Sequence, residues 1–430
     1  MAESLNIRNL VLTMLAETLE DGEFSHVVVN RTFSKEKLEY RDRAFVSRLY
    51  LGVLERLIFL DHCINRVSSV NTVKMRPVIL NILRCGAYQL MFMDSVPDHA
   101  AINESALLTK KRGFSRLVPF VNGVLRSIQR EGAGIVKESM PENVRLSVPK
   151  WIYELTVAGF GRKRAKAFFE GALEADKPLC IRLNTINVPE DEIIRSLEAQ
   201  GCTVVPADES GGCHYLRLSG VLTDLEAYRR GWFSVQDISS VKAALTGCRE
   251  LEKTGINAPL IVDVCAAPGG KSICAAQEFP YAHVYSRDLS PAKTALIDEN
   301  IKRLGITNIR SQVFDAKVKD PLMEGRADMV IADLPCSGIG VIGKKPDIKF
   351  RLRKKDLEGL VGLQRQILEA VHTYVKKGGI LLYSTCTVNI GENAENVKWF
   401  MREHPFELIS EEQILEGRGD GFYIAVLKRI

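Results

Sequence analysis

The sequence predicts a multidomain protein in which an all-α bundle is followed by a small α+β module and then by an α/β domain with a parallel sheet. Three observations support this fold class. The chain has 430 residues, which suits two to four domains at about 150 residues each. Apolar residues recur every three or four positions over residues 1–140. From residue 236 onward, short apolar strands alternate with helical segments.

The first 140 residues are predicted to form the helical bundle, with Pro77 and Pro97 at helix starts or breaks. Helical periodicity alone does not distinguish a scaffold from a binding domain. Residues 141–177 are predicted to be a helical linker that contains two further helices within residues 147–173. The predicted helical segments of the bundle are residues 7–19, 40–67, 75–93 and 99–111.

A change of pattern marks the small α+β module, which is predicted over residues 178–235 and is expected to be ferredoxin-like or RRM-like. Its strand, helix, strand and strand are predicted at residues 178–186, 190–201, 202–208 and 215–220. The α/β domain is predicted over residues 236–430, because regular strand-helix alternation implies a parallel sheet. Its strands are predicted at residues 260–268, 283–289, 309–316, 328–335 and 378–387, with a last apolar segment at 421–430.

Composition excludes several classes of protein. The hydrophobic fraction of 46% and the charged fraction of 26% are ordinary for a globular protein, so a disordered or fibrous chain is disfavoured. No apolar run approaches the ~20 residues that span a bilayer, and the N-terminus lacks the pattern of a signal peptide. We therefore expect a cytoplasmic protein with no membrane association.

The ten cysteines form no CxxC pair, so neither a disulfide scaffold nor a zinc finger is expected. The neighbours Cys213 and His214 have no further ligands at suitable spacing. We therefore predict no metal site.

Basic residues gather in three clusters, at residues 344–355, 109–116 and 161–166. The first holds seven basic residues against one acid. Such clusters are typical of proteins that bind a phosphate backbone, although a single basic run is often only a solvated face. We expect an RNA partner, with residues 344–355 as the first candidate surface, and we expect the protein to act as a monomer.

Residues that suit a nucleoside-type cofactor follow the predicted strands. "DVCAAPGGK" (263–271) is a tight loop that opens a helix, and it is neither a GxGxxG nor a Walker A motif. Asp288, Asp315 and Asp333 end the next three strands, and the carboxyl edge of an open α/β sheet is where ligands bind. Because phosphate-binding loops are absent, S-adenosylmethionine fits this edge better than NAD or ATP.

Two cysteines follow the fourth and fifth strands of the same sheet, in "ADLPCSG" and "YSTCT". Cys336 and Cys386 are therefore expected near one crevice, beside the cofactor. A thiolate there has a specific use, because its addition to carbon 6 of a pyrimidine makes carbon 5 nucleophilic enough to take a methyl group. A buried structural cysteine is the alternative.

These motifs, with "NAENV" downstream, resemble the RNA cytosine-5 methyltransferase family, also called the Nol1/Nop2/Sun family. Upstream, "RDRAFVSRLYLGVLER" and the segment 76–108 resemble the NusB-type RNA-binding fold. The combination, over nearly the whole chain, is similar to the bacterial members that methylate 16S ribosomal RNA. It implies a Rossmann-like class I methyltransferase domain preceded by RNA-binding domains.

The resemblance implies a role for each matching residue. Cys386 matches the nucleophile, Cys336 the second cysteine that assists product release, and Asp333 the acid that hydrogen-bonds the cytosine ring. Asp288 matches the ribose contact and Asp315 the adenine contact, and Asp333 adjoins the same cofactor site. The methionine-binding loop matches Cys265, Ala266, Ala267, Pro268, Gly269, Gly270 and Lys271. Where the family often has "RRPD", this chain has "GKKPD", which keeps the charge.

Two other functions stay open at this point. The same chemistry on transfer RNA or large-subunit RNA is disfavoured only by analogy with the helical N-terminal domain. A non-catalytic RNA-binding or assembly factor is disfavoured by the intact cysteines and acids. Methylation of an exocyclic nitrogen is disfavoured because "DLPCSG" replaces the loop expected for it, and uridine methylation calls for no second cysteine.

Overall fold

The computed structural model describes residues 6–430 except 137–138, 175–177, 208–211, 219 and 417–418. The chain divides into two compact units. The first contains residues 1–173 and 342–352, and the second contains residues 174–341 and 353–430. None of the helices in the described ranges is long and apolar enough to cross a membrane. The predicted fold class is confirmed, whereas the four predicted domain ranges stay a prediction.

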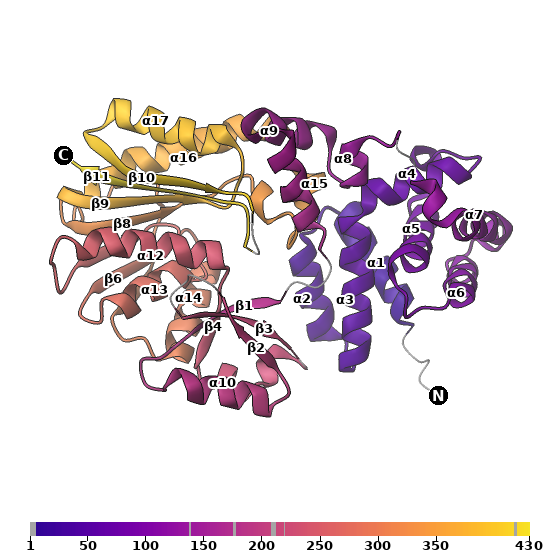
Figure 1. Ribbon diagram of the computed structural model, residues 1–430, viewed down its shortest axis with the longest axis horizontal. Coiled ribbons are helices and arrows are strands. Elements are labelled where there is room, and N and C mark those ends of the chain that lie inside the picture. The colour runs from indigo at the N-terminus through magenta and orange to yellow at the C-terminus, as the bar shows by residue number, and fades with distance from the viewer. Residues whose placement is uncertain (1–5, 137–138, 175–177, 208–211, 219, 417–418) are drawn as a thin grey trace. The chain divides into compact units, whose positions relative to one another are not determined.

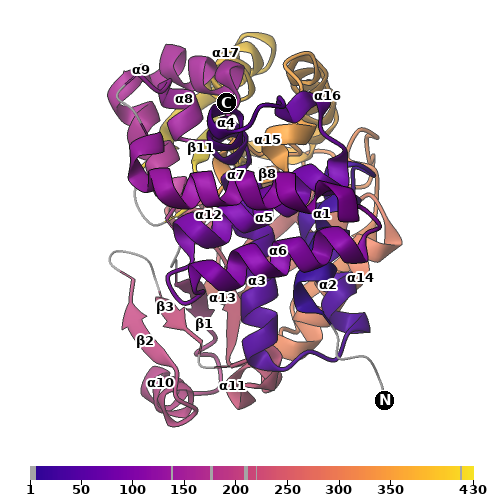
Figure 2. The ribbon, with the colours of Figure 1, turned by 90° about the vertical axis from the view of Figure 1, so that its right-hand side faces the viewer.

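The first unit is the predicted helical bundle. The helix predicted over residues 40–67 is interrupted at Arg56, and two helices that the prediction did not name, α2 and α7, complete the bundle. Helices α5, α6 and α7 contact one another and face the viewer in Figure 2. The helices are α1 (Ile7–Leu19), α2 (Ser25–Lys35), α3 (Tyr40–Glu55), α4 (Leu57–Val67), α5 (Pro77–Phe92), α6 (Asp98–Lys111), α7 (Val118–Glu131), α8 (Glu142–Arg145) and α9 (Lys150–Ala172). Short 3-10 turns lie at Thr72–Lys74, Ser115–Leu117 and Gly132–Ile135.

The two helices predicted within residues 147–173 are confirmed, because α9 is broken at Gly161, whose φ of 78° and ψ of 157° are not helical. Residues 175–177 of the predicted linker lie outside the described residues. The core of the unit is a single apolar cluster drawn from α1 to α7.

The basic segment 342–352 belongs to the first unit, and it carries the short helix α15 (Ile348–Arg351). Lys349 is only 5% exposed, and its ammonium donates to the carbonyl oxygens of Glu55 at 2.8 Å and Ser147 at 3.1 Å. Asp347 is also buried and accepts a hydrogen bond from Ser25. The expectation that this run presents its charges to RNA is therefore wrong for Lys349, whose charge binds the helical bundle.

The second unit contains the predicted small module as a four-stranded antiparallel sheet with the strand order β2-β3-β1-β4. This is the order of a ferredoxin-like βαββαβ unit. The predicted strands and helix are present, and the short last strand adds to them. The elements are β1 (Leu179–Leu183), α10 (Glu190–Ala199), β2 (Thr203–Pro206), β3 (Cys213–Arg217), α11 (Glu226–Arg229) and β4 (Phe233–Val235), with a 3-10 turn at Leu222–Asp224.

The rest of the second unit is a seven-stranded sheet with the order β10-β11-β9-β8-β5-β6-β7. The five predicted strands are parallel, whereas β11 and β10 form an antiparallel hairpin at one edge that the prediction of a parallel sheet did not include. The strands are β5 (Leu260–Asp263), β6 (His283–Asp288), β7 (Ile309–Val313), β8 (Ala327–Asp333), β9 (Val375–Thr385), β10 (Phe406–Ile414) and β11 (Phe422–Arg429).

Helices cover both faces of this sheet, as Figure 1 shows. Residues of α16 and α17 pack on one face, and residues of α12, α13 and α14 pack on the other. Buried side chains on both faces explain why the central strands β5 and β8 are largely apolar. The helices are α12 (Ile238–Glu252), α13 (Gly270–Glu278), α14 (Pro291–Leu304), α16 (Asp356–Val371) and α17 (Ala394–Glu403), with 3-10 turns η5 (Ile339–Val341), η6 (His372–Tyr374) and η7 (Ile390–Glu392).

Candidate active site

A tight loop joins β5 to α13 at the carboxyl edge of the sheet. β5 ends at Asp263 and α13 begins at Gly270, so residues 264–269 form the whole connection. Gly269 has a φ of 104°, a conformation that a side chain would strain, and its amide donates to the carbonyl oxygen of Ala266 at 2.6 Å. The first amides of a helix have no acceptor within the helix, so this turn can present them to a ligand.

Asp288, at the end of β6, is fixed against this loop. Its carboxylate is buried and accepts hydrogen bonds from the amides of Ala267 at 3.0 Å and Leu289 at 2.7 Å. Lys293 lies 3.0 Å from the same carboxylate. Asp315 follows the neighbouring strand β7, is partly exposed and accepts from the amide of Lys317 at 3.0 Å. Backbone amides therefore fix Asp288 beside the loop, whereas Asp315 accepts from an amide of its own turn.

Asp333, at the end of β8, lies between the loop and β9. Lys271, from the first turn of α13, donates to its Oδ2 at 2.7 Å, and Ser384 of β9 donates to its Oδ1 at 2.7 Å. The ammonium of Lys271 also donates to Ser240 at 2.9 Å and lies 5.0 Å from the ring centre of Phe422. The pairing of β8 with β9 sets Asp333 opposite Ser384, so the sheet register itself builds this contact.

Asp263 and Cys265, at the start of the loop, contact the interior of the protein and have a structural role. Asp263 is buried and accepts from the hydroxyl of Ser272 at 2.6 Å. Burial raises the pKa of Asp263 to about 7, although the Ser272 hydrogen bond opposes the shift. The side chain of Cys265 packs against the apolar core, and burial raises its pKa well above the usual range of a thiol. Neither group is placed as a reactive side chain.

The two predicted cysteines meet. Their sulfur atoms, Sγ of Cys336 and Sγ of Cys386, lie 3.4 Å apart, and both thiols are free. The hydrogen bond to Cys386 raises the pKa of Cys336 well above its ordinary value, and burial raises it further. The proton of the pair is therefore held more strongly by Cys336 than by an ordinary thiol.

Glu392 joins the loops that carry the two cysteines, and the sequence prediction did not include it. It is fully buried and accepts hydrogen bonds from the amide of Ser337 at 2.8 Å and from its hydroxyl at 2.6 Å. It also accepts from Asn389 at 3.0 Å and Gln364 at 3.0 Å. Ser337 follows Cys336 directly and Asn389 lies three residues after Cys386, so one carboxylate positions both loops. Its position in "NIGENAEN", beside the quoted motif, was the available signal.

Gly340 makes a second connection between the same loops. Its amide donates to the carbonyl oxygen of Cys386 at 3.1 Å, and its own carbonyl accepts from the amide of Gly421 at 2.9 Å. A Cβ at this position would lie 1.8 Å from the carbonyl oxygen of Gly421. Only a residue without a side chain allows this close backbone approach.

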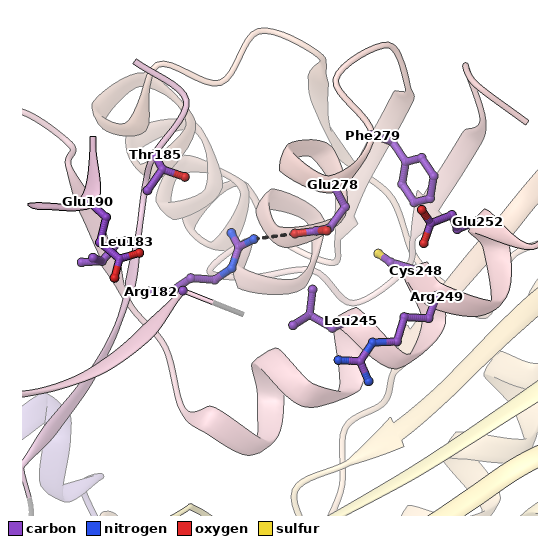
Figure 3. A pocket seen from close by; sticks show the side chains of 11 residues that line it. Arg182, Leu183, Thr185, Glu190, Leu245, Cys248, Arg249, Glu252, Glu278 and Phe279 are labelled. Carbon is purple, nitrogen blue, oxygen red and sulfur yellow. Dashed lines mark hydrogen bonds and ion pairs between the residues drawn. The ribbon is translucent and has the colours of Figure 1, made fainter. Parts of the chain in front are cut away.

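A cavity of about 470 Å³ lies elsewhere in this unit, between the small module and the α/β domain (Figure 3). The Arg182 guanidinium from β1 pairs across it with Glu278 at the end of α13, at 3.0 Å. Leu245, Cys248 and the other residues that line it include none of the predicted site residues. Glu278 lies at the opposite end of α13 from Gly270, so this cavity is separate from the loop at the carboxyl edge.

The geometry thus brings three predicted residues, Asp333, Cys336 and Cys386, to one edge of the sheet, next to the loop that ends in Lys271. The carboxylate of Asp333, which Lys271 and Ser384 hold in place, can hydrogen-bond a polar ring. A thiol of the cysteine pair can attack that ring. The arrangement suits nucleophilic catalysis on a heterocyclic base next to a bound cofactor.

Comparison with known proteins identifies two regions of the chain. A family model described as 16S rRNA methyltransferase RsmB/F matches residues 254–428, and a model of the NusB family matches residues 5–130. A relative from Bacillus subtilis named "Probable ribosomal RNA small subunit methyltransferase B" is 32% identical and covers 93% of this chain and 89% of its own length. A relative from Cronobacter sakazakii named "Ribosomal RNA small subunit methyltransferase B" is 30% identical over 99% of both chains.

Solved structures show the same fold. A crystal structure of PH0851 superposes with a TM-score of 0.80 at 23% identity, over 99% of this chain and 100% of that chain. A structure of NSun6 from Pyrococcus horikoshii with SFG gives a TM-score of 0.57 at 21% identity, over 65% of this chain and 98% of that chain.

Proposed function

This chain belongs to the 16S rRNA methyltransferase RsmB/F family, and we propose that it transfers a methyl group from S-adenosylmethionine to carbon 5 of a cytidine in 16S ribosomal RNA. The observation that carries the cytosine-5 chemistry is the pair of thiols, 3.4 Å apart, in the loops that follow β8 and β9. A single nucleophilic thiol would suffice for addition to a pyrimidine. A second thiol at the same base is useful when the adduct must be released afterwards.

The residues at the loop fit S-adenosylmethionine by the chemistry of their donors and acceptors. Asp288 is held by backbone amides at the point where a ribose would present its hydroxyls, and Asp315 at the end of the next strand can accept from an adenine amine. Residues 265–271 would hold the methionine part. When bound, the cofactor supplies an electrophilic methyl group. No metal ion takes part in the proposed reaction.

Cys386 is the proposed nucleophile. Its sulfur would form a bond to carbon 6 of the cytosine, and the electrons of the 5,6 double bond would make carbon 5 nucleophilic. Carbon 5 would then take the methyl group that the cofactor supplies, while the bond between that methyl group and the sulfonium sulfur breaks and its electron pair stays on the sulfur. Asp333 hydrogen-bonds the ring of the base and stabilises the adduct, and Lys271 and Ser384 fix that carboxylate in place. Loss of the proton from carbon 5 and of the sulfur from carbon 6 restores the double bond. Cys336 assists this release.

The target base must leave its stack to reach these groups, so an unpaired or exposed cytidine is the proposed substrate. In this proposal the helical domain, residues 1–140, and the small module, residues 178–235, bind RNA by shape and charge. The exposed basic residues within the cluster 344–355 keep their proposed part in RNA binding; they are Lys344, Lys345, Arg353, Lys354 and Lys355.

The test uses 16S RNA from cells that lack this gene, incubated with radiolabelled S-adenosylmethionine and the wild-type, Cys386→Ala or Cys336→Ala protein. Wild type should place the label in 5-methylcytosine, and Cys386→Ala should place none. Cys336→Ala should accumulate a protein–RNA adduct that survives a denaturing gel.

Three outcomes would contradict all or part of the proposal. Unchanged methylation by Cys386→Ala would remove the nucleophile assignment. If the wild-type protein methylates no RNA, the alternative of a non-catalytic RNA-binding factor is favoured. If it methylates only transfer RNA or large-subunit RNA, the proposed substrate is wrong but the proposed chemistry stays.

A further inference from the structure

Two histidines and a glutamate gather at the end of α16, away from the cysteines. Glu369 lies in the last turn of α16, His372 begins the 3-10 turn η6, and His404 follows the last residue of α17. The candidate ligand atoms of these three side chains all lie within 4.8 Å of one another. In the described ranges, no other group of three or more His, Cys, Asp or Glu side chains is this close together. We propose that these three residues bind a divalent transition metal ion of the zinc class.

The fold brings the three side chains together from distant parts of the sequence. Glu369 and His372 are three residues apart, so they project from the same side of the helical segment. His404 arrives from α17, which packs against α16 through a hydrogen bond from Arg365 to Asn396 at 2.9 Å. The two imidazole rings lie 3.9 Å apart, centre to centre. Sequence spacing could not indicate this cluster, and the sequence predicted no metal site.

The distance between two of the candidate ligand atoms suits an ion with tetrahedral coordination. Nε2 of His404 and Oε1 of Glu369 are 3.2 Å apart. Two ligand atoms that each lie about 2.0–2.1 Å from a tetrahedral zinc ion are roughly 3.3 Å from each other. This pair therefore already has the spacing of one edge of a zinc tetrahedron. The candidate ligand nitrogen of His372 lies within 4.8 Å of these two atoms and would supply the third ligand, and water would complete the site.

His372 is suited to ligation. An imidazole nitrogen that makes no hydrogen bond can offer its lone pair to a metal ion, and the cations Lys319 and Arg429 lie near this ring. Its Nδ1 is buried without a hydrogen-bond partner in the described part of the chain. Glu369 is half-exposed, which gives an ion a route from solvent. The two neighbouring cations reduce the affinity for a dication, so we expect an exchangeable ion.

The proposed site is separate from the catalytic edge. The cluster lies just before Val375, where β9 begins, whereas Cys386 follows the other end of this 11-residue strand. A strand of that length spans roughly 30 Å. A bound ion would therefore fasten α16 to α17 without touching the thiols, and its effect would be on stability.

The experiment measures zinc binding to the full-length protein after removal of metals with a chelator, by equilibrium dialysis at pH 7.5. Because zinc also binds thiolates, the reference protein is the Cys336→Ser/Cys386→Ser double variant, which removes the thiol pair. We expect that variant to bind one equivalent of zinc. Zinc at a hundredfold excess over its dissociation constant should raise the melting temperature of the variant by roughly 5 °C or more.

Two substitutions in that background decide the result. His404→Gln and, separately, Glu369→Gln should each weaken zinc binding at least tenfold and remove the shift in melting temperature. Glu369→Gln is the safer variant, because its side chain is half-exposed and glutamine has nearly the same size. Arg365→Gln, which alters the same helix pair but offers no zinc ligand, should keep zinc binding. Equal zinc binding by the Glu369→Gln, His404→Gln and reference proteins would overturn the proposal.

Discussion

Gly340→Ala should disable the enzyme although no reactive group is changed. A Cβ at this position would lie 1.8 Å from the carbonyl oxygen of Gly421 and 2.7 Å from that of Cys386. Real Cβ atoms essentially never approach another heavy atom within 3.0 Å, so the backbone segments must separate by about 1 Å. The movement breaks or stretches the hydrogen bonds that Gly340 makes to Cys386 and Gly421, at 3.1 and 2.9 Å.

The size of the effect follows from this displacement. A misplacement of about 1 Å costs on the order of 100-fold in rate when the reacting atoms must be aligned. Overpacking of a tight site costs about 1–3 kcal/mol in the free energy of unfolding. We therefore expect kcat for methyl transfer to 16S RNA to fall about 100-fold. The loop at residues 264–271 is not touched, so the dissociation constant for S-adenosylmethionine should change little.

The assay compares kcat from radiolabelled methyl transfer with cofactor binding by isothermal titration calorimetry. Intact cofactor binding shows that the variant is folded. Gly362→Ala on α16 is the matched control, because a Cβ there meets no atom within 4 Å and alanine favours a helix, so its activity should equal that of wild type. Wild-type kcat in a folded Gly340→Ala protein would refute the reasoning.

Three further predictions follow from buried groups. Because burial lowers the pKa of Lys349 to about 7, below the value of about 10.4 in the unfolded chain, the unfolded state binds more protons between these values. Stability should therefore rise with pH from 7 to 9, by up to roughly 1.4 kcal/mol per pH unit, and Lys349→Met should remove this rise in urea unfolding. Glu392 accepts four hydrogen bonds, and Glu392→Gln replaces one of its acceptor oxygens by an NH2 donor. The change should lower the free energy of unfolding by about 1–3 kcal/mol, as measured by thermal unfolding, and should lower kcat. Diamide, which takes two electrons and two protons from two thiols, should join Cys336 to Cys386 in a disulfide and abolish activity. Dithiothreitol should reduce this disulfide and restore activity. A protein that lacks Cys336 should lose no titratable thiol at the same dose of diamide.

The carboxyl edge of the sheet could be predicted because strand direction decides it. Parallel strands end at one edge, so residues such as Asp333, Cys336 and Cys386 must gather there once the strands are recognised. The alternation of strand and helix predicted the ferredoxin-like or RRM-like class of the small module, but not the order of its strands. It did not predict β10, whose exposed polar residues hide its strand character.

The buried polar contacts could not be predicted, because they depend on which loops meet. Lys349 looks like one more surface charge in a basic run, and only the tertiary structure shows that two carbonyl oxygens bind its ammonium. The sequence "NIGENAEN" places Glu392 beside the quoted motif, but only the tertiary structure shows the four hydrogen bonds that it accepts. His372 and His404 lie too far apart in sequence for any spacing rule.

The proximity of the two thiols also gives an order to the proposed reaction. Two sulfurs 3.4 Å apart cannot both carry a negative charge at neutral pH, so one proton stays with the pair. The hydrogen bond to Cys386 and the charge on Cys386 both raise the pKa of Cys336, so Cys336 keeps its proton in the resting enzyme. Once the Cys386 sulfur is bonded to carbon 6 it carries no charge, and both of these contributions disappear. Cys336 then ionises more easily at the stage when a base is needed to remove the proton from carbon 5. On this argument, the covalent bond made by the first cysteine prepares the second one for product release.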